Sequence, residues 1–456
     1  MMWLSEVAQV VHGQLRGADV QVSSVGTDTR MILAQQLFVA IKGERFDGNQ
    51  FATEALAKGA AAVLISDANS AASPAVLVAD TRLALGQLAA HWRQQLKAPV
   101  AAITGSNGKT TTKEMLHAIL AAATGDAACI HATYGNLNND IGLPLTLLKA
   151  RAQHQYLVLE MGMNHLGEID YLTHIAKPNV AVVNNAGIAH IGELGSRENI
   201  AQAKGEIFAG LADDGIAVMN ADDPFADYWR SLNTQRKVLT FALTAPADVS
   251  ASYTEGSSEM QVHLTTPNGA VEFALPVLGV HNLYNALAAS TAAVALGVTN
   301  ASIAQGLSQF AGVKGRLQHK AGFNAATLID DTYNANPDSM KAAIDVLSKL
   351  QGATLMVMGD MGELGADAAI MHAEVGRYAK AKGIHQLMTF GDLSAGAAKA
   401  FGANAQHFID LDALVSAVKS HMQAGVTVLV KGSRFMRMER VVDLLEAGQT
   451  KQVQKA

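Results

Sequence analysis

Short apolar runs alternate with amphipathic segments along most of the chain. The run at residues 100–103 is continuous and apolar, as expected of a strand buried on both faces of a sheet. The segment after it repeats apolar residues at Met115, Leu116, Ile119 and Leu120, the spacing of one helix face. Comparable apolar runs recur at residues 37–41, 60–65, 75–79, 155–160, 179–185, 215–220, 326–331, 354–360, 386–392 and 426–432. This alternation predicts an α/β protein in which helices cover mostly parallel sheets.

We expect three domains, with boundaries at 1–82, 83–313 and 314–456. The first is a small α/β domain with a helix at roughly 50–58. The second is a P-loop ATPase-type parallel-sheet domain with a β-hairpin insertion at 258–275, where apolar residues alternate around a Pro-Asn-Gly turn. The third is a Rossmann-like, doubly wound domain. No Gly-x-Gly-x-x-Gly opens its helices, so a dinucleotide site is not predicted there.

Composition narrows the class of protein. Of the 456 residues, 49% are hydrophobic and 16% are charged, which is typical of a globular protein, and the net charge of −6 argues against a general nucleic-acid binder. A single cysteine, Cys129, excludes an internal disulfide framework. The N-terminus carries Glu6 and no basic n-region, and the apolar stretch 286–298 is too short to cross a bilayer. We therefore expect a cytoplasmic enzyme with no membrane span.

Residues 99–112, PVAAITGSNGKTTT, carry the strongest chemical signal. A predicted strand leads into a glycine loop and then a helix N-terminus, an arrangement that binds anions. In such a loop Lys109 reaches phosphate oxygens and the Thr110 hydroxyl binds Mg²⁺. Ile103 stands where the common P-loop has its first glycine, so the spacing is the shorter Gly-x-x-Gly-Lys-Thr. An ordinary glycine turn with a surface lysine is disfavoured, because strand, loop, lysine and helix occur in the required order.

Polar residues follow several predicted strands of the second domain. Lys109, Glu160, Asn184, His190 and Asp222 each come after an apolar run, so parallel strands should bring them to one edge of the sheet. Glu160 is the best carboxylate for Mg²⁺, whereas a lone histidine such as His190 is as often structural. By helical spacing alone, Lys204 is expected to be exposed to solvent. The polar stretches 27–30 and 42–51 could hold a phosphorylated ligand, but composition alone favours solvated turns there.

Ten motifs in one order give a resemblance that spans nearly the whole chain. They are the phosphate loop together with GNLNNDIGLP (135–144), LEMGMNHLGEI (159–169), NNAGIAHIGELGS (184–196), AQAKGEIF (201–208), GVHNLYNALAA (279–289), GRLQ (315–318), IDDTYNANPDSM (329–340), GDMGELG (359–365) and VKGSRFMRMERVV (430–442). This set resembles the Mur ligase family. Within it, the motifs are most similar to those of enzymes that add D-alanyl-D-alanine to UDP-N-acetylmuramoyl-tripeptide in peptidoglycan synthesis.

The resemblance implies roles for individual residues. The implied catalytic residues are Lys109, Glu160, His190 and Lys204. The implied ATP-binding residues are Gly105, Ser106, Asn107, Gly108, Lys109, Thr110, Thr111, Asn282, Asn285, Arg316 and Asp331. Two Mg²⁺ ions are implied, on Thr110, Glu160, His190 and a carbamylated Lys204. The residues implied to bind the uridine nucleotide are Thr29, Arg30, Lys42, Gly43, Asp47 and Gly48, and Arg45 is expected to bind its diphosphate. Asn138 and Asn139 are also implied to bind substrate. The residues implied to face the amino-acid substrate are Asn334, Asn336 and Lys431. Asn49 departs from the histidine that relatives often have.

The implied reaction is phosphoryl transfer followed by acyl transfer in a monomer. A reactive acyl phosphate must be shielded from water, so we expect the third domain to close over the nucleotide, with a hinge near 312–315. Three alternatives stay open. The chain could be a sister ligase or a folylpolyglutamate synthase-like ligase, a P-loop NTPase that switches a partner, or a non-catalytic nucleotide-binding subunit. The third residue of the tripeptide, meso-diaminopimelate or lysine, also stays open.

Overall fold

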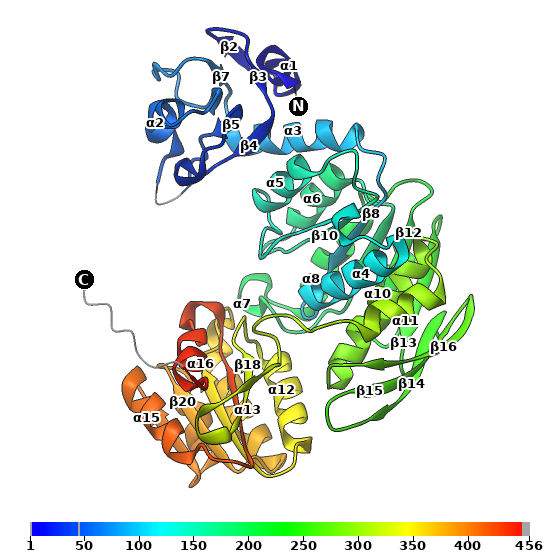
Figure 1. Cartoon of the computed structure of the whole chain (residues 1–456), viewed down its shortest axis with the longest axis vertical. Coiled ribbons are helices and arrows are strands. Elements are labelled where there is room, and N and C mark those ends of the chain that lie inside the picture. The colour runs from blue at the N-terminus through cyan, green and yellow to red at the C-terminus, as the bar shows by residue number, and fades with distance from the viewer. Residues whose placement is uncertain (1, 44–45, 449–456) are drawn as a thin grey trace.

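The computed structural model describes residues 2–43 and 46–448, and it contains three large sheets, each with its own helices, and one short two-stranded sheet near the N-terminus (Figure 1). The N-terminal sheet lies at one end of the long axis and the C-terminal sheet at the other, with the central sheet linking them. The expected three-domain α/β architecture is confirmed. In the described part of the chain, no helix is long and apolar enough to cross a membrane.

The N-terminal domain is built on a five-stranded sheet of order β2-β7-β6-β5-β4, in which only β2 is antiparallel to its neighbour. Helix α3 leads from this domain to the central one, and Asp80 caps it by accepting hydrogen bonds from the amides of Arg82 and Leu83. The elements are β1 (Met2–Trp3), α1 (Leu4–Val10), β2 (Gln14–Arg16), β3 (Gln21–Val22), β4 (Ser24–Gly26), η1 (Thr29–Met31), β5 (Gln36–Val39), η2 (Gly48–Phe51), α2 (Ala52–Ala57), β6 (Ala62–Ile65), β7 (Ala75–Leu77) and α3 (Thr81–Gln94).

The central domain has a nine-stranded sheet of order β16-β15-β14-β13-β12-β11-β8-β10-β9, parallel from β9 to β14. Strands β15 and β16 form the predicted hairpin, and β14 extends it antiparallel to β15. The strands are β8 (Val100–Thr104), β9 (Ile130–Ala132), β10 (Tyr156–Glu160), β11 (Val180–Val183), β12 (Ile216–Asn220), β13 (Lys237–Ala242), β14 (Val249–Glu255), β15 (Met260–Thr266) and β16 (Gly269–Leu275). The helices are α4 (Lys109–Thr124), η3 (Ala127–Cys129), α5 (Gly142–Lys149), α6 (Glu168–Ala176), α7 (Ile191–Leu194), α8 (Arg197–Gly205), η4 (Glu206–Phe208), α9 (Ala226–Ser231), α10 (Val280–Ala295) and α11 (Asn300–Ser308).

Strand β8 explains why its sequence is apolar without alternation. Val100 and Ala102 belong to the core on one face of the central sheet, whereas Ala101 and Ile103 belong to the core on the other face. Both faces are covered by helices, so every side chain of this strand is buried. The strand is thereby held rigidly at the centre of the sheet, with its carboxyl end leading into the phosphate loop.

The C-terminal domain has a six-stranded sheet of order β17-β18-β22-β19-β20-β21, with β17 antiparallel at one edge. Its first long helix begins with a capping box between Asn336 and Ser339 and has Pro337 in its first turn. The elements are β17 (Gln318–Ala321), η5 (Phe323–Ala325), β18 (Thr327–Asp331), α12 (Pro337–Lys349), β19 (Ala353–Gly359), η6 (Gly365–Asp367), α13 (Ala368–Ala381), β20 (Gln386–Phe390), α14 (Ala395–Phe401), β21 (Ala405–Phe408), α15 (Leu411–His421), β22 (Val426–Lys431), η7 (Arg434–Met436) and α16 (Glu439–Leu445).

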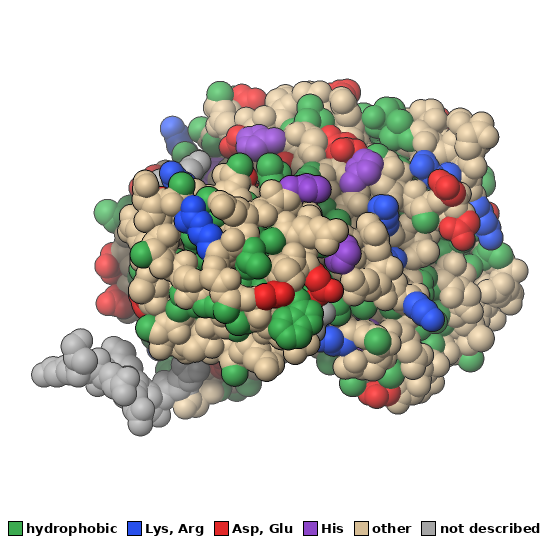
Figure 2. Space-filling model, turned by 90° about the horizontal axis from the view of Figure 1, so that it is seen from above, with side chains coloured by type: hydrophobic (Ala, Val, Ile, Leu, Met, Phe, Trp, Pro, Cys, Tyr) green, Lys and Arg blue, Asp and Glu red, His purple; other side chains and the backbone are tan. Residues whose placement is uncertain are grey.

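The surface and the linker agree with the sequence analysis. Acidic and basic side chains are interspersed among the described residues of the face drawn in Figure 2, in keeping with the modest net charge.

In the linker to the C-terminal domain, Gly312 and Gly315 have φ values of 78° and 71°, which favour glycine. The two glycines thus hold backbone conformations that other residues rarely adopt, and the hinge at 312–315 stays a prediction.

The packing of α11 against the phosphate-loop helix α4 gives a stability prediction. An added Cβ at the buried Gly306 would lie 2.4 Å from Cα of Ile119, so Gly306→Ala must push the two helices apart. We expect a loss of roughly 1–3 kcal/mol in the free energy of unfolding. The matched control is Gly396→Ala in α14, where the nearest atom would be 3.6 Å away, and we expect a gain of roughly 0.4–1 kcal/mol. Urea unfolding measures both, and equal effects of the two substitutions would contradict the packing argument.

Candidate active site

The phosphate loop is fixed between the ends of β8 and β11. Asn185 accepts a hydrogen bond from the Asn107 amide on its Oδ1 atom at 2.9 Å, and from the Ser106 amide on its carbonyl at 3.0 Å. Gly108 has a φ of 82°, and a Cβ there would lie 2.0 Å from Oδ1 of Asn285. Glycine is therefore required at this position both by the backbone and by the close approach of α10. The loop presents its backbone at the N-terminus of α4, as an anion site needs.

Two cationic side chains meet at this loop. Lys109 donates a hydrogen bond to the Gly105 carbonyl at 2.7 Å, and burial lowers the pKa of its amine. Arg316 comes from the start of the C-terminal domain and donates to Oγ1 of Thr110 at 2.9 Å. The guanidinium carbon of Arg316 lies 4.3 Å from the ring centroid of Tyr333, which holds the guanidinium from its other side. The expected arrival of Arg316 at the nucleotide loop is thus present in this structure.

Glu160 ends β10 beside the loop and is 2% exposed. Its Oε2 atom accepts a hydrogen bond from Thr110 Oγ1 at 2.8 Å, and its Oε1 atom accepts one from Asn138 Nδ2 at 2.7 Å. A hydroxyl and a carboxylate side by side are hard oxygen donors, the type that Mg²⁺ prefers. The residues therefore fit one Mg²⁺ ion, which would take its remaining oxygens from water and phosphate. Across the described residues, no group of three or more His, Cys, Asp or Glu side chains forms a metal cluster.

Lys204 lies in α8 and is 2% exposed, so the expectation of an exposed lysine from helical spacing is wrong. Within residues 2–43 and 46–448, its amine takes part in no hydrogen bond or ion pair of the structure. Burial, together with the charge of Lys109, holds the pKa of Lys204 well below its usual value. Lys204 lies one turn after the buried Ile200 and shares its face of α8, whereas Glu198 and Gln202 are exposed, so the expectation failed because a lysine was assumed to be on the solvent face.

His190 has a left-handed backbone conformation, with a φ of 62°. Its Nδ1 atom lies 2.8 Å from Oε2 of Glu363 in the C-terminal domain. The contact with His190 lowers the pKa of the Glu363 carboxyl. Glu363 was not among the predicted site residues, although it stands in the GDMGELG motif. Tyr333, in the IDDTYNANPDSM motif, was missed in the same way.

A cavity of about 460 Å³ opens between the central and C-terminal domains beside the phosphate loop. The predicted nucleotide and substrate residues in its lining are Asn107, Gly108, Thr111, Asn282, Asn285, Arg316, Asp331 and Lys431. Lys431 pairs with Asp331 at 2.7 Å and donates to the Asn334 carbonyl at 2.9 Å, so this lysine already has an acidic partner. Asn336 donates to Oδ1 of Asn107 at 2.8 Å, which ties the start of α12 to the phosphate loop.

Asp222 also reaches this edge of the sheet, as expected, but its carboxylate is fully engaged. It accepts hydrogen bonds from the amides of Leu243, Thr244 and Ala245 and from the Tyr284 hydroxyl. Burial alone would raise its pKa, yet a hydrogen bond from the Thr244 hydroxyl, together with these bonds, brings the pKa down to about 2. Asp222 therefore shapes the wall of the cavity. Asn139, which was predicted to bind substrate, instead stabilises the start of α5, because its Oδ1 accepts a hydrogen bond from the Gly142 amide.

The predicted uridine-nucleotide residues lie in loops of the N-terminal sheet and outside the lining of this cavity. Arg30 follows Thr29 in η1 and pairs with Asp28 at 2.7 Å, while its side chain stays 86% exposed. Asp47 caps η2, Lys42 lies 3.9 Å from it, and the Gly43 amide donates to the Phe46 carbonyl. The backbone of Gly48 lies so close to Ile41 that an added Cβ would be 2.5 Å from the Ile41 carbonyl oxygen. Arg45 lies outside the described residues. Asn49 joins this loop to the end of β6 through the amides of Ser66 and Asp67.

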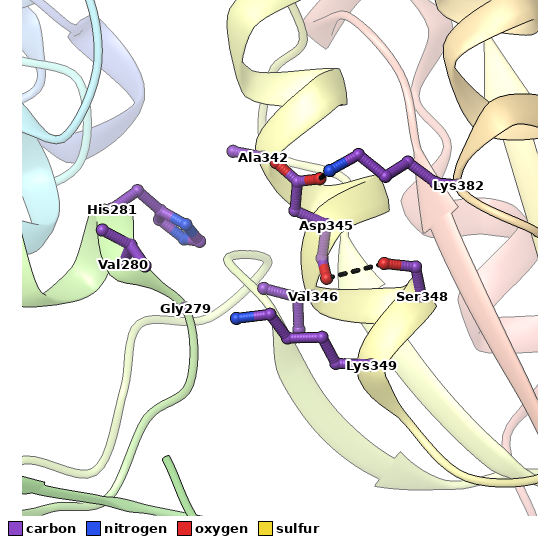
Figure 3. A pocket seen from close by; sticks show the side chains of 9 residues that line it. All are labelled: Gly279, Val280, His281, Ala342, Asp345, Val346, Ser348, Lys349 and Lys382. Atoms are coloured by element: carbon purple, nitrogen blue, oxygen red, sulfur yellow. Dashed lines mark hydrogen bonds and ion pairs between the residues drawn. The ribbon is translucent and has the colours of Figure 1, made fainter. Parts of the chain in front are cut away.

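A second cavity of about 320 Å³ lies next to the first, between the start of α10 and the end of α12 (Figure 3). His281 and Ala342 line both cavities. Its two lysines are already paired, Lys382 with Asp345 at 2.6 Å and Lys349 with Glu255. Burial lowers the pKa of His281 to about 4, so its ring is neutral near pH 7. The cavity thus offers no free cation among the residues that line it, and we assign it no ligand.

Comparison with known proteins decides the family. Three family models match: "Mur ligase family, catalytic domain" at residues 21–93, "Mur ligase middle domain" at 103–293, and "Mur ligase, glutamate ligase domain" at 315–434. The UDP-N-acetylmuramoyl-tripeptide–D-alanyl-D-alanine ligase of Escherichia coli is 43% identical over 456 residues, which cover 98% of this chain and 99% of the relative.

This chain belongs to the Mur ligase family.

Solved structures of the Mur ligase family are similar to it over almost their full length. The MurF crystal structure from Acinetobacter baumannii matches with a TM-score of 0.88 and 38% identity, covering 96% of this chain and 97% of that one. The MurF ligase of Thermotoga maritima, solved in complex with ADP, matches with a TM-score of 0.83 and 29% identity, covering 93% and 97%. The family assignment made from the motifs is confirmed.

Proposed function

We propose that this Mur ligase uses ATP to join D-alanyl-D-alanine to UDP-N-acetylmuramoyl-tripeptide, which gives the UDP-linked pentapeptide precursor of peptidoglycan. The observation that carries the proposal is the convergence of Lys109, Glu160 and Arg316 on one phosphate loop. The near full-length similarity to relatives that bear this activity in their names supports the choice of substrates. Because the reaction uses ATP and a nucleotide-linked substrate, we expect it to occur in the cytoplasm.

The proposed reaction has two steps. A carboxylate oxygen of the tripeptide attacks the γ-phosphorus of ATP, the bond to the β-phosphate oxygen breaks, and ADP leaves. The amine nitrogen of the dipeptide then attacks the acyl carbon of the acyl phosphate, the bond to the phosphate oxygen breaks, and the amine loses a proton. Lys109 and Arg316 would neutralise the charge of the transferred phosphoryl group. Mg²⁺, when bound at Thr110 and Glu160, supplies further neutralisation of that charge.

We assign the substrates to the three domains, with the boundaries 1–82, 83–313 and 314–456. The exposed Arg30 and Lys42 would bind the diphosphate of the UDP substrate, and Asn138 would lie near its peptide. Asn334 and Asn336, with Lys431, would face the dipeptide. All these groups belong to one chain, and we infer that it acts as a monomer.

The substrates can be tested directly by phosphate release and product mass. With UDP-tripeptide and ATP, we expect rapid turnover on D-alanyl-D-alanine and slow turnover on D-alanine, because a single residue cannot also fill the distal carboxylate site. Omitting any one substrate should abolish phosphate release. Lys109→Ala serves as the control for contaminating activity and should lose at least about 10²-fold in turnover. Equal use of D-alanine would overturn the dipeptide assignment, and turnover only with a folate and glutamate would move the chain to another branch.

We also propose that Lys204 carries a carbamate. Its buried amine has no partner among the described residues and a lowered pKa, so the neutral nucleophile is available to attack CO₂. The neutral nitrogen bonds to the carbon of CO₂, one carbon–oxygen π bond breaks to place the negative charge on oxygen, and the nitrogen releases one proton, so an uncharged amine becomes an anion that can attract Mg²⁺. His190 would serve as a further ligand of the second Mg²⁺ ion.

The carbamate is testable by carbon-13 NMR and by chemical rescue. Protein equilibrated with ¹³C-labelled bicarbonate should show a carbamate signal that disappears in Lys204→Ala. That variant should lose activity, and short carboxylic acids should restore part of it by filling the vacated space with oxygens. Lys109→Ala is the matched control, because an added acid cannot replace its positive charge. An unchanged NMR signal in Lys204→Ala would rule out a carbamate on this residue.

A further inference from the structure

The central and C-terminal domains meet through two short segments that are far apart in the sequence. One is the docking segment, residues 187–195, which follows β11 and includes α7; the other is the GELG loop, residues 362–365, which follows β19. The Gly192 amide donates to the Glu363 carbonyl at 3.0 Å. The Ile188 amide donates to Oδ2 of Asp338 at 2.9 Å, which adds a second link to the same domain.

The fit between these segments is sterically tight. A Cβ at Gly192 would lie 2.7 Å from the Gly365 nitrogen and 2.9 Å from the Glu363 carbonyl oxygen. Ile191 packs partly against the core of the central domain and partly against the core of the C-terminal domain. The docking segment therefore makes this set of contacts only when the C-terminal domain lies against it. A small displacement of that domain would separate the two backbones.

This docking brings the Glu363 carboxylate to one side of the His190 ring. Oε2 of Glu363 lies 2.8 Å from Nδ1 of His190, which is a charge contact between the two domains. A neutral imidazole carries its proton on only one nitrogen. A carboxylate beside Nδ1 favours the proton there and leaves the lone pair on Nε2 available to ligate a metal.

We propose that Glu363 is a positioning residue that fixes the orientation and tautomer of His190 while the C-terminal domain is docked. Through the docking segment and the GELG loop, closure of the C-terminal domain thereby determines the tautomer of the His190 ring. The consequence for metal binding rests on the proposed function, whereas the effect of Glu363 on the ring does not. His190 and Glu363 both adopt left-handed backbone conformations, each with a φ of 62°, so the backbone of each segment turns sharply at this contact.

The test compares Glu363→Met with Glu363→Gln. Methionine keeps the length of the side chain and removes the acceptor, whereas the glutamine amide oxygen still faces Nδ1. Nitrogen-15 NMR, with the His190 signal assigned from His190→Asn, should show the Nε2–H tautomer gaining population in Glu363→Met and less so in Glu363→Gln. In turnover assays, kcat should fall about 10- to 100-fold in Glu363→Met with an unchanged KM for ATP, the scale of an outer partner of a metal-bound histidine. Glu193→Gln, on the exposed side of α7, is the charge-matched control for Glu363→Gln and should change neither readout.

Hydrogen exchange at the Gly192 amide separates positioning from docking. Glu363→Met leaves the backbone bond in place, so exchange of the peptide spanning 187–195 should match wild type. Gly192→Ala should speed that exchange and also shift the His190 tautomer, because it forces the two segments apart. The inference is overturned if Glu363→Met leaves the tautomer unchanged, or if it speeds exchange as much as Gly192→Ala does. A tautomer shift in a protein that ligates none of the proposed substrates would refute the proposed function and support this inference.

Discussion

A cluster of basic side chains at one edge of the central sheet is the constraint on which the rest of the site depends. Lys109 lies close to both Lys204 and Arg316, and the carboxylates of Glu160 and Glu363 lie near it. Like charges in a desolvated site raise the free energy of the folded chain unless anions neutralise them. The two lysines respond with lowered pKa values. The site is thus suited to bind a polyphosphate, whose negative charge would favour the protonated lysines.

The position of this charge depends on contributions from two domains. The central domain supplies the rigid strand β8, the glycine loop and the N-terminus of α4. The C-terminal domain supplies Arg316, which reaches Thr110, and Asn336, which reaches Asn107. The same docking places Glu363 beside His190. The nucleotide loop and its surroundings are therefore complete only when the two domains are in contact, which suits a reaction whose intermediate must be kept from water.

The sequence was informative wherever local pattern determines position. Continuous apolar runs predicted the strands, and parallel pairing then placed Glu160, Asn184 and Asp222 at one sheet edge. Period-two alternation predicted the β15–β16 hairpin. The motif resemblance added the family, which no periodicity could supply. These inferences succeeded because strands and hairpin turns depend on residues that are close together in the sequence, so their pattern can be recognised without the fold.

The remaining features depend on contacts between distant segments. The pairing of His190 with Glu363 and the stacking of Arg316 on Tyr333 arise only when the C-terminal domain folds back. Lys204 was misplaced because its charge suggested the solvent face, although it lies one turn after the buried Ile200 of the same helix. Lys431 was expected to face a substrate, but it pairs with Asp331, because β18 and β22 lie side by side with these two residues opposite each other. The pattern of a single strand does not show which strand will be its neighbour.

The central claim is that the C-terminal domain contributes a cation to the phosphate site. Calorimetric titration with a non-hydrolysable ATP analogue and Mg²⁺ tests it without requiring turnover. Relative to wild type, Arg316→Ala should weaken binding by at least about tenfold, the scale of one hydrogen bond to a charged group. Arg377→Ala, an exposed arginine of the same domain, is the matched control and should bind as wild type does. Equal affinity for wild type and Arg316→Ala would contradict the account.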